Sequence, residues 1–183
     1  NRMSKITIKS KVSEYDPFSD QRIDYQEITL NESVIIRKLN FINQHTYLVQ
    51  DGKSPEDPQN YEVPFDDPDV NLKSDYCVYR DKVGFLSPEQ IKKIRQKLNF
   101  SLRETSAILG ISYSTLSEIE NGVILQSEIQ DNLLRMLLHP YFLVKIIEDH
   151  KQLIQLKLGP NGYQQIINKI HAQQNWDDDK LQM

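Results

Sequence analysis

Four serines between residues 87 and 127 constrain the fold of this 183-residue chain more than any other feature. Each stands just before a segment of periodic apolar residues, where a helix N-cap is expected, because a serine side chain accepts a hydrogen bond from an otherwise unpaired backbone N–H. Glutamine or glutamate follows three of them three residues later, which completes a capping box. The four are Ser87, Ser101, Ser112 and Ser127. Their spacing predicts four short consecutive helices.

Apolar side chains recur at helical spacing within these segments and predict one shared core. Gly110 follows the second segment, and glycine readily adopts the left-handed conformation that ends a helix. We therefore expect Gly110-Ile111-Ser112 to be the tight turn between the second and third helices, and Asn121-Gly122 to close the third. The predicted inward residues are Ile91, Ile94, Leu98, Ala107, Ile108, Leu109, Leu116, Ile119, Ile129, Leu133, Leu134 and Leu137.

The third predicted helix has a polar side opposite its apolar residues. That side carries Tyr113, Ser114, Ser117, Glu118 and Asn121. Short polar side chains on an outward helix face are free to hydrogen-bond to base edges in a DNA groove. The tight turn followed by a polar helix therefore indicates a helix-turn-helix DNA-binding module.

The segment AILGISYSTLSEIENG, at residues 107–122, resembles the helix-turn-helix of the Cro/repressor superfamily, also called XRE-like. A longer run is more specific, with YRDKVGFLSPEQIKKIRQKLNFS before the motif and QSEIQDNLLRMLLHP after it. Over roughly residues 76–140 the chain is similar to the C-terminal DNA-binding half of MqsA-type antitoxins. These bacterial proteins neutralise a toxin and repress their own operon, so the resemblance implies operator DNA and a toxin as partners.

Three features depart from the pattern of that family. Leu102 stands where the family usually has a glutamine that touches a phosphate, and Glu118 stands where a basic or neutral residue is common. Both residues remove attraction for DNA. The family's N-terminal half carries two Cys-x-x-Cys pairs for zinc, whereas this chain has only Cys77 and four scattered histidines. We therefore predict no metal site and no cofactor.

Basic residues gather in the first two predicted helices. Residues 82–103 hold one acid, Glu89, against Lys82, Lys92, Lys93, Arg95, Lys97 and Arg103. In helix-turn-helix complexes these elements cross the phosphate backbone, so a positive field there favours binding. A solvated helix face without a partner is the alternative. The predicted DNA-binding residues are Lys92, Lys93, Ser101, Leu102, Arg103, Ser112, Tyr113, Ser114, Thr115, Ser117, Glu118 and Asn121.

The N-terminal part is predicted to form a small β-rich domain over residues 1–50. Ile6 and Ile8 alternate with polar residues, and the later short runs are rich in β-branched and aromatic residues. One helix around residues 31–42 is expected to pack on this sheet. Residues 51–69 contain four prolines and seven carboxylates. They are predicted to be an acidic linker, either a solvated spacer or a segment that wraps a basic partner.

Residues 70–138 are the predicted helix-turn-helix domain, which a helix over 69–82 leads into. A helix over 140–158 and a last amphipathic helix follow, with Gly159-Pro160 between them. Residues 139–183 hold more apolar surface than such a domain requires, so they are predicted either to form a dimer interface or to complete the core. The predicted fold class is α+β: a small β-rich N-terminal domain, then an all-α helix-turn-helix domain with extra C-terminal helices.

Composition argues against several other classes of protein. One cysteine cannot form an intramolecular disulfide framework, and no apolar run approaches the roughly 20 residues that span a bilayer. No phosphate-binding loop, nucleophile elbow or zinc-protease motif occurs in the sequence. We predict a cytoplasmic protein that is not an enzyme.

The leading hypothesis is a sequence-specific transcriptional repressor that binds operator DNA as a homodimer. The resemblance further implies the antitoxin of a type II toxin–antitoxin pair that autoregulates its operon. One alternative is a stand-alone phage-type or stress-response repressor whose N-terminal domain senses a ligand or a protein. Another is a protein-interaction module that no longer binds DNA, which Leu102 and Glu118 keep open. A toxin-like reading frame beside the gene would favour the antitoxin.

Overall fold

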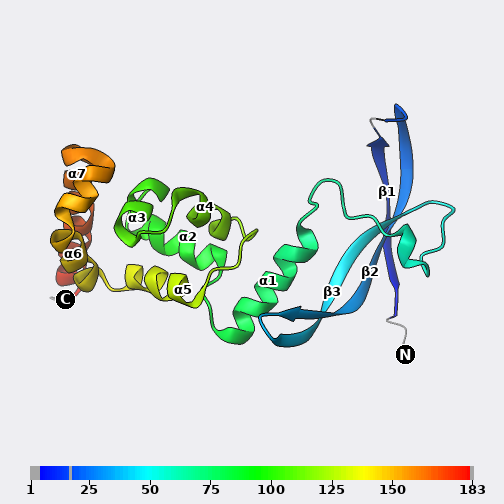
Figure 1. Ribbon diagram of the computed structural model, residues 1–183, viewed down its shortest axis with the longest axis horizontal. Helices are drawn as coiled ribbons and strands as arrows, with labels where there is room; N and C mark the ends of the chain where they lie inside the picture. Colours follow the sequence, from blue (N-terminus) through cyan, green and yellow to red (C-terminus); the bar gives the residue numbers. More distant parts are fainter. Residues whose placement is uncertain (1–4, 17, 182–183) are drawn as a thin grey trace. The chain divides into compact units, whose positions relative to one another are not determined.

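The chain divides into two compact units, Asn1–Tyr79 and Arg80–Met183, in a computed structural model that describes residues 5–16 and 18–181 (Figure 1). The first unit holds a three-stranded antiparallel sheet and the start of a helix, and the second is helical. A sheet followed by helices confirms the predicted α+β fold class.

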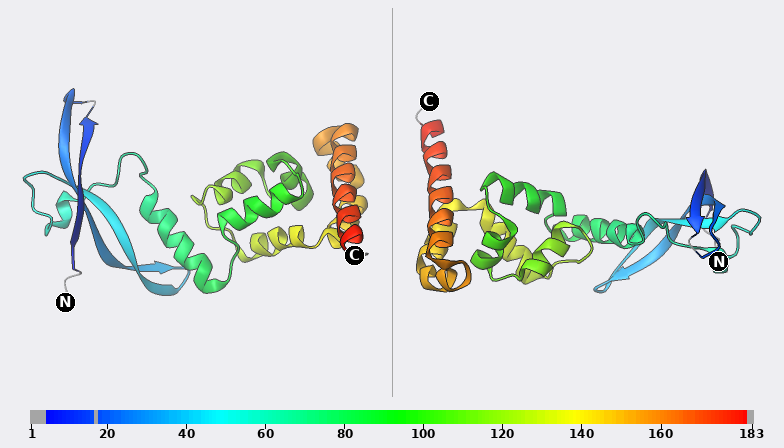
Figure 2. Two further views of the ribbon diagram at one scale, coloured as in Figure 1. Left: turned by 180° about the vertical axis from the view of Figure 1, so that it is seen from behind. Right: turned by 90° about the horizontal axis from the view of Figure 1, so that it is seen from above.

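The sheet of the first unit consists of β1 (Thr7–Asp16), β2 (Gln21–Ile36) and β3 (Leu39–Gln50), paired in that order. β2 and β3 form a long, curved hairpin (Figure 2). It turns at Arg37 and Lys38, whose φ angles are 45° and 71°. Two positive φ angles are typical of the type I′ turn, which fits the twist of a hairpin and is usually marked by Asn-Gly. Residues 31–42 lie in this hairpin, so the prediction of a helix there is wrong. Arg37-Lys38 lacks the Asn-Gly sequence that usually marks such a turn.

A small apolar core lies in the first unit. Its buried residues are Ile28, Leu30 and Val49. Tyr61 follows the 3-10 turn η1 (Pro58–Asn60) and stacks on Tyr47 of β3, with 5.1 Å between ring centroids. Because a three-stranded sheet with so few buried residues is marginal by itself, other contacts must stabilise it.

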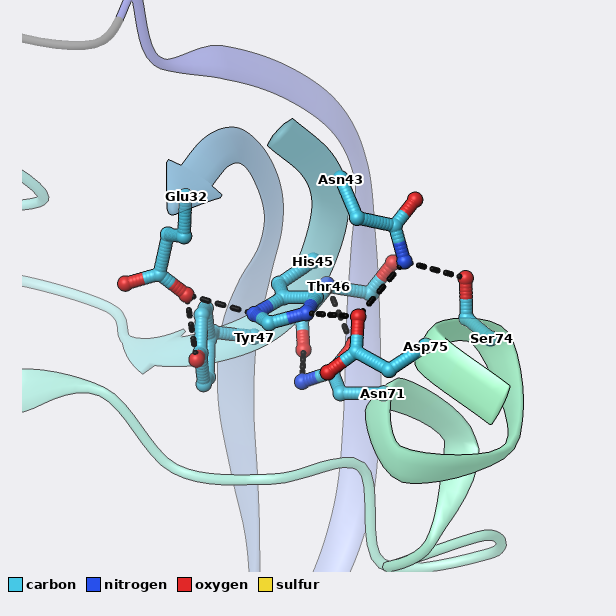
Figure 3. Close-up of polar contacts among 8 residues, drawn as sticks. All are labelled: Glu32, Asn43, His45, Thr46, Tyr47, Asn71, Ser74 and Asp75. Atoms are coloured by element: carbon cyan, nitrogen blue, oxygen red, sulfur yellow. Dashed lines mark hydrogen bonds and ion pairs between the residues drawn. The ribbon is translucent and has the colours of Figure 1, made fainter. Parts of the chain in front are cut away.

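The first turns of α1 (Val70–Val83) provide such contacts, through a polar network on the sheet (Figure 3). His45 lies between two carboxylates, with Nδ1 2.7 Å from Glu32 Oε2 and Nε2 2.8 Å from Asp75 Oδ1. Since a carboxylate only accepts hydrogen bonds, this geometry suits a protonated imidazole that donates from both ring nitrogens. Burial lowers the pKa of His45, but the hydrogen bonds to Asp75 and Glu32 outweigh it and raise the pKa above its ordinary value.

Two further side chains complete this network. Asn43 Nδ2 donates to Asp75 Oδ1 at 2.7 Å and also lies 3.0 Å from Ser74 Oγ. The Tyr47 hydroxyl donates to Glu32 Oε2 at 2.7 Å. Burial and this hydrogen bond raise the pKa of Tyr47, so its hydroxyl keeps its proton and remains a donor. α1 is thus tied to the sheet largely by polar contacts.

The outer edge of β3 is covered at two places. Leu48 exchanges backbone hydrogen bonds with Glu62, at 2.7 and 2.9 Å, so part of the segment 51–69 lies along this edge. Two residues earlier, the Asn71 side chain accepts from the backbone N–H of Thr46 at 2.8 Å and donates to its carbonyl at 2.9 Å. The amide of Asn71 therefore takes the place of a neighbouring strand.

Seven elements follow α1 in the second unit. They are α2 (Pro88–Lys97), α3 (Leu102–Leu109), α4 (Tyr113–Glu120), α5 (Glu128–Arg135), η2 (Met136–Leu138), α6 (Pro140–Asp149) and α7 (Lys151–Leu181). The predicted caps are confirmed: Ser87, Ser101 and Ser127 form capping boxes, and Ser112 caps α4 through the Thr115 N–H. Local sequence thus determines where α2 to α5 begin.

One continuous core joins all these helices. The prediction that Ile129 points inward is wrong, because this residue of α5 is 73% exposed and lies outside the core. Leu116 and Ile119 of α4 are fully buried in it, as are Ile147 of α6 and Ile166 and Ile170 of α7. Part of the apolar surplus predicted for residues 139–183 therefore serves the core. The apolar side chains that stay exposed on α6 and α7 include Tyr141, Phe142, Leu153 and Leu156.

The C-terminal helices break at two points (Figure 2). α6 ends at Asp149, and His150 leaves helical geometry with φ −99° and ψ 18°. The prediction of one helix over 140–158 is therefore wrong at this corner, which neither glycine nor proline marks. Within α7, Gly159 interrupts the helix with φ 77° and ψ 168°. Within residues 5–16 and 18–181, no helix combines the length and apolar character that crossing a membrane requires.

A buried polar cluster joins the two ends of the segment 80–135. Arg80 is only 2% exposed, and its Nε donates to Gln126 Oε1 at 2.8 Å. Gln126 in turn donates to the Leu86 carbonyl at 2.8 Å, while the Leu86 N–H donates to Asp131 Oδ1 at 2.8 Å. Arg135 pairs with the other oxygen of Asp131 at 2.8 Å. Hydrogen bonds to Gln126 and the Ile124 carbonyl offset the burial of Arg80, and Arg135 neutralises Asp131. Removing one partner would leave another buried polar group unsatisfied.

Candidate nucleic-acid interface

α3 and α4 are joined by a turn whose geometry is fixed by side chains. The Ser101 N–H donates to Glu104 Oε2 at 2.7 Å, and the Glu104 N–H donates to Ser101 Oγ at 3.1 Å, so α3 starts at a closed capping box. Gly110 ends the helix with φ 72°, which an L side chain rarely adopts. Ser106 Oγ then donates to the Ile111 carbonyl at 2.6 Å and holds the turn against α3.

α4 is anchored on its inner side by apolar and ionic contacts. Leu116 and Ile119 have no exposed surface. Arg95 of α2 pairs with both carboxylate oxygens of Glu120, at 2.7 and 2.8 Å, and its third donor contacts the Phe100 carbonyl at 2.8 Å. The hydrogen bond to Glu120 raises the pKa of Arg95 despite its burial. The charge of Arg95 is thus used inside the domain.

The outer side of α4 is polar and accessible. We call this outer side the α4 face, and it consists of Tyr113, Ser114, Ser117, Glu118 and Asn121. Tyr113 is 51% exposed, Ser117 is half-buried, and the other three are exposed. A two-helix unit with a rigid turn and a free polar face on its second helix is the arrangement that places side chains in a major groove.

Comparison with known families agrees with this geometry. Residues 91–139 match the helix-turn-helix family model. The matched segment runs from within α2 to the end of η2, and it supports a DNA-binding transcription regulator of the broad XRE-like group. Searches of curated proteins and of solved structures found no match to the chain.

The basic residues predicted for this helix-turn-helix domain lie on α2 and α3. Lys92 and Lys93 are exposed on α2, and Arg103 is exposed in the first turn of α3. The Arg103 guanidinium lies 6.0 Å from the centre of the Tyr113 ring, within the range of a cation–π contact. The structure therefore brings Arg103 to the first residue of the α4 face.

Four other predicted site residues have local roles in the helix-turn-helix fold. The hydroxyl of Ser112 accepts from the Thr115 N–H at 3.2 Å and donates to Thr115 Oγ1 at 2.8 Å. Ser101 is occupied by its capping box with Glu104. Leu102 is half-buried and packs against the core. Packing explains an apolar residue at this position without reference to DNA.

The sequence did not reveal how α7 supports α3. Lys169 Nζ lies 2.9 Å from both carboxylate oxygens of Glu104, and Lys157 Nζ contacts the Ala107 carbonyl at 3.2 Å. Burial raises the pKa of Glu104, but the contacts with Lys169 and Ser101 outweigh it, so that the pKa is lowered. No local pattern links residues 65 positions apart, so only the tertiary structure shows this pair.

Metal-binding groups are dispersed in both units. Cys77 is exposed on α1. In the part of the chain that the structure describes, no three His, Cys, Asp or Glu side chains are grouped to hold a metal ion.

Proposed function

We propose that this chain is a sequence-specific repressor that reads its operator with the α4 face, and that it is the antitoxin of a type II toxin–antitoxin pair that regulates its own operon. The observation that carries the first part is the division of α4 into two sides. Its apolar side is fully buried and ionically anchored, whereas its polar side is exposed. A helix held in this way can enter a groove without losing its support.

Phosphate contacts come from the basic residues of α2 and α3 in this proposal. Lys92 and Lys93 are exposed, and Arg103 is positioned at the start of α4 by the Tyr113 ring. Exposed cations of this kind neutralise phosphates and release counterions, which supplies affinity for any sequence. They set the position of the domain on the duplex and carry no sequence information themselves.

Base recognition comes from the α4 face. Ser114 and Ser117 both donate and accept, Asn121 can pair with adenine, and the Tyr113 ring can contact a thymine methyl group. These groups favour a site rich in A·T pairs. Glu118 is exposed on the same face and would repel phosphates but can accept from a cytosine amino group.

We propose a homodimer for tight operator binding, because one small module buries too little DNA surface. The exposed apolar side chains of α6 and α7 suit the interface. They are Tyr141, Phe142, Leu153 and Leu156. Two copies related by a two-fold axis would contact half-sites about one helical turn apart.

The antitoxin part of the proposal rests on the first unit and on the resemblance to MqsA-type antitoxins. Residues 1–79 hold more acidic than basic residues, which suits capture of a basic toxin surface. DNA binding and toxin binding would then use different units. A stand-alone repressor remains the alternative if no neighbouring gene product is toxic.

A mobility-shift titration with the gene's own promoter tests the operator part. Ser114→Ala and Ser117→Ala should each cost about 1–3 kcal/mol on the promoter while leaving binding to random DNA unchanged. Equal losses on both DNAs would show that these serines do not read bases. Co-expression with the neighbouring gene tests the antitoxin part: both variants should still suppress its toxicity, since the first unit is unaltered.

A further inference from the structure

A pocket of about 500 Å³ lies in the first unit, and none of its side chains belongs to the His45 network or to the α4 face. The acidic aromatic pocket is lined by Glu14, Tyr15, Asp16, Phe18, Tyr25, Glu62 and Phe65. These residues come from β1, the β1–β2 connection, β2 and the segment 51–69. Its volume lies within the range of ordinary ligand sites.

The charge in the pocket is entirely negative. Asp16 accepts from Ser19 Oγ at 2.7 Å and from the Phe18 N–H at 2.9 Å, and these two bonds lower its pKa. Glu14 and Glu62 are half-buried. Glu14, Asp16 and Glu62 line the pocket together with Tyr25. Burial first, and then the charges of Glu62, Asp16 and Glu14, raise the pKa of Tyr25. Within the described residues, no lysine, arginine or histidine forms an ion pair with any of the three carboxylates.

The remaining walls are aromatic, and they are unusually exposed. The ring of Phe18 is 99% exposed, and Tyr15 and Phe65 are 56% and 47% exposed. Phe65 meets Tyr25 edge-to-face, with 5.5 Å between ring centroids. The Tyr15 hydroxyl donates to Asp20 at 2.7 Å, which fixes the ring beside the pocket. Exposed rings next to carboxylates that have no cationic partner provide both a π-face and a counter-charge for a cation.

We propose that this pocket binds an arginine side chain of a partner protein. A guanidinium is planar and weakly hydrated, so it can stack on Phe18 or Tyr15 while it pairs with two oxygens of Glu62 or Glu14. An ammonium is more strongly hydrated and lacks the flat face. The volume exceeds that of one side chain, so residues flanking the arginine also fit. The inference deepens the proposed function and rests on it for the identity of the partner, a basic toxin.

The test uses a capped Gly-Gly-Arg-Gly-Gly peptide, titrated into the full ¹⁵N-labelled chain and followed by NMR. The citrulline peptide has the same shape without the charge, and the lysine peptide has the charge without the plane. We expect saturable amide shifts at residues 14–16, 18, 25, 62, 63 and 65, with the citrulline peptide at least about tenfold weaker and the lysine peptide intermediate. Equal binding of the citrulline peptide, or no shifts at these residues with millimolar arginine peptide, would overturn the proposal.

Matched variants separate the pocket from general acidity. Glu62→Gln should weaken the arginine peptide about tenfold, whereas Glu56→Gln removes the same charge from the same segment outside the pocket and should not. Phe18→Ala should weaken it about threefold to tenfold, and Ile35→Ala, which truncates another exposed apolar residue, should have no effect. If Glu56→Gln is as harmful as Glu62→Gln, the binding is diffuse and the pocket is not a site. Because the peptide assay contains neither DNA nor toxin, its failure is distinct from failure of the repressor or antitoxin proposals.

Discussion

The two units hold their helices in place by different means. In the second unit, eighteen buried residues from Leu86 to Ile170 form one apolar core, and the ion pairs Arg95–Glu120 and Lys169–Glu104 are added to it. In the described part of the first unit, the apolar cluster consists of three buried residues, Ile28, Leu30 and Val49, and α1 is tied down through His45 and Asp75. The difference teaches that the second unit rests mainly on apolar burial with ion pairs added, whereas the first unit rests mainly on hydrogen bonds to an imidazole that can be protonated.

The largest effect should come from the apolar core of the second unit. Leu116→Ala removes a side chain with no exposed surface and leaves a cavity beneath α4, which should cost about 2–5 kcal/mol of unfolding free energy. Urea denaturation measures the loss, and hydrogen exchange should localise it to residues 80–173. As a control, Ile129→Ala truncates a side chain that is 73% exposed and should change stability by less than about 0.5 kcal/mol. Equal effects of the two variants would contradict the comparison.

The polar network of the first unit should yield a smaller loss. Asp75→Asn keeps the shape of the side chain but removes the charge that faces His45, which should cost about 1–3 kcal/mol. Hydrogen exchange should rise in residues 70–79 and in β3 while α2 to α5 stay protected. Asp81→Asn makes the same substitution at an exposed position of α1 and should leave exchange unchanged. If Asp75→Asn is silent, the network does not hold α1.

The units should also respond to pH in opposite directions. The pKa of His45 is raised above its ordinary 6.5, so its contribution is complete below that value and is lost as pH rises through the raised pKa. The pKa of Glu104 is lowered below its ordinary 4.5, so its contribution is complete above that value and is lost as pH falls through the lowered pKa. Hydrogen exchange across a pH series, corrected for the intrinsic rate, checks both directions. Loss of protection in both units toward the same pH extreme would refute the assignment.

The smallest effect on folding should come from Lys93→Ala, an exposed change within about 0.5 kcal/mol of the parent stability. The same variant should weaken the binding of DNA. Promoter and random DNA should be weakened alike, and the slope of log affinity against log salt should fall by about one. Fluorescence anisotropy at several salt concentrations measures the slope. An unchanged slope would remove Lys93 from the phosphate contacts.

The boundaries of α2 to α5 could be predicted because their causes are local. Ser87, Ser101 and Ser127 each act on a backbone group within three residues, and Gly110 acts on its own φ angle. The polar side of α4 also follows from periodicity alone. Sequence therefore locates the candidate interface as well as the turn that orients it.

The remaining features depend on contacts that no local pattern encodes. Glu104 and Lys169 are 65 positions apart, and His45 and Asp75 are 30 positions apart. The hairpin turn at Arg37-Lys38 was missed because its left-handed backbone is imposed by the pairing of β2 with β3 rather than by its residue types. The acidic aromatic pocket needs residues from four segments to meet, and the sequence alone predicts only the acidic character of the segment 51–69.

The covered edge of β3 has a consequence for how this protein avoids aggregation. An open strand edge offers its N–H and C=O groups to any other extended chain, and a unit with so small an apolar core opens easily. Glu62 occupies the groups of Leu48, and the amide of Asn71 occupies those of Thr46. A crowded cell presents many extended segments, including unfinished chains leaving the ribosome. Asn71 thus blocks edge-to-edge pairing at Thr46 of β3. We expect loss of this side chain to favour fibrous self-association at a small cost in the stability of the fold.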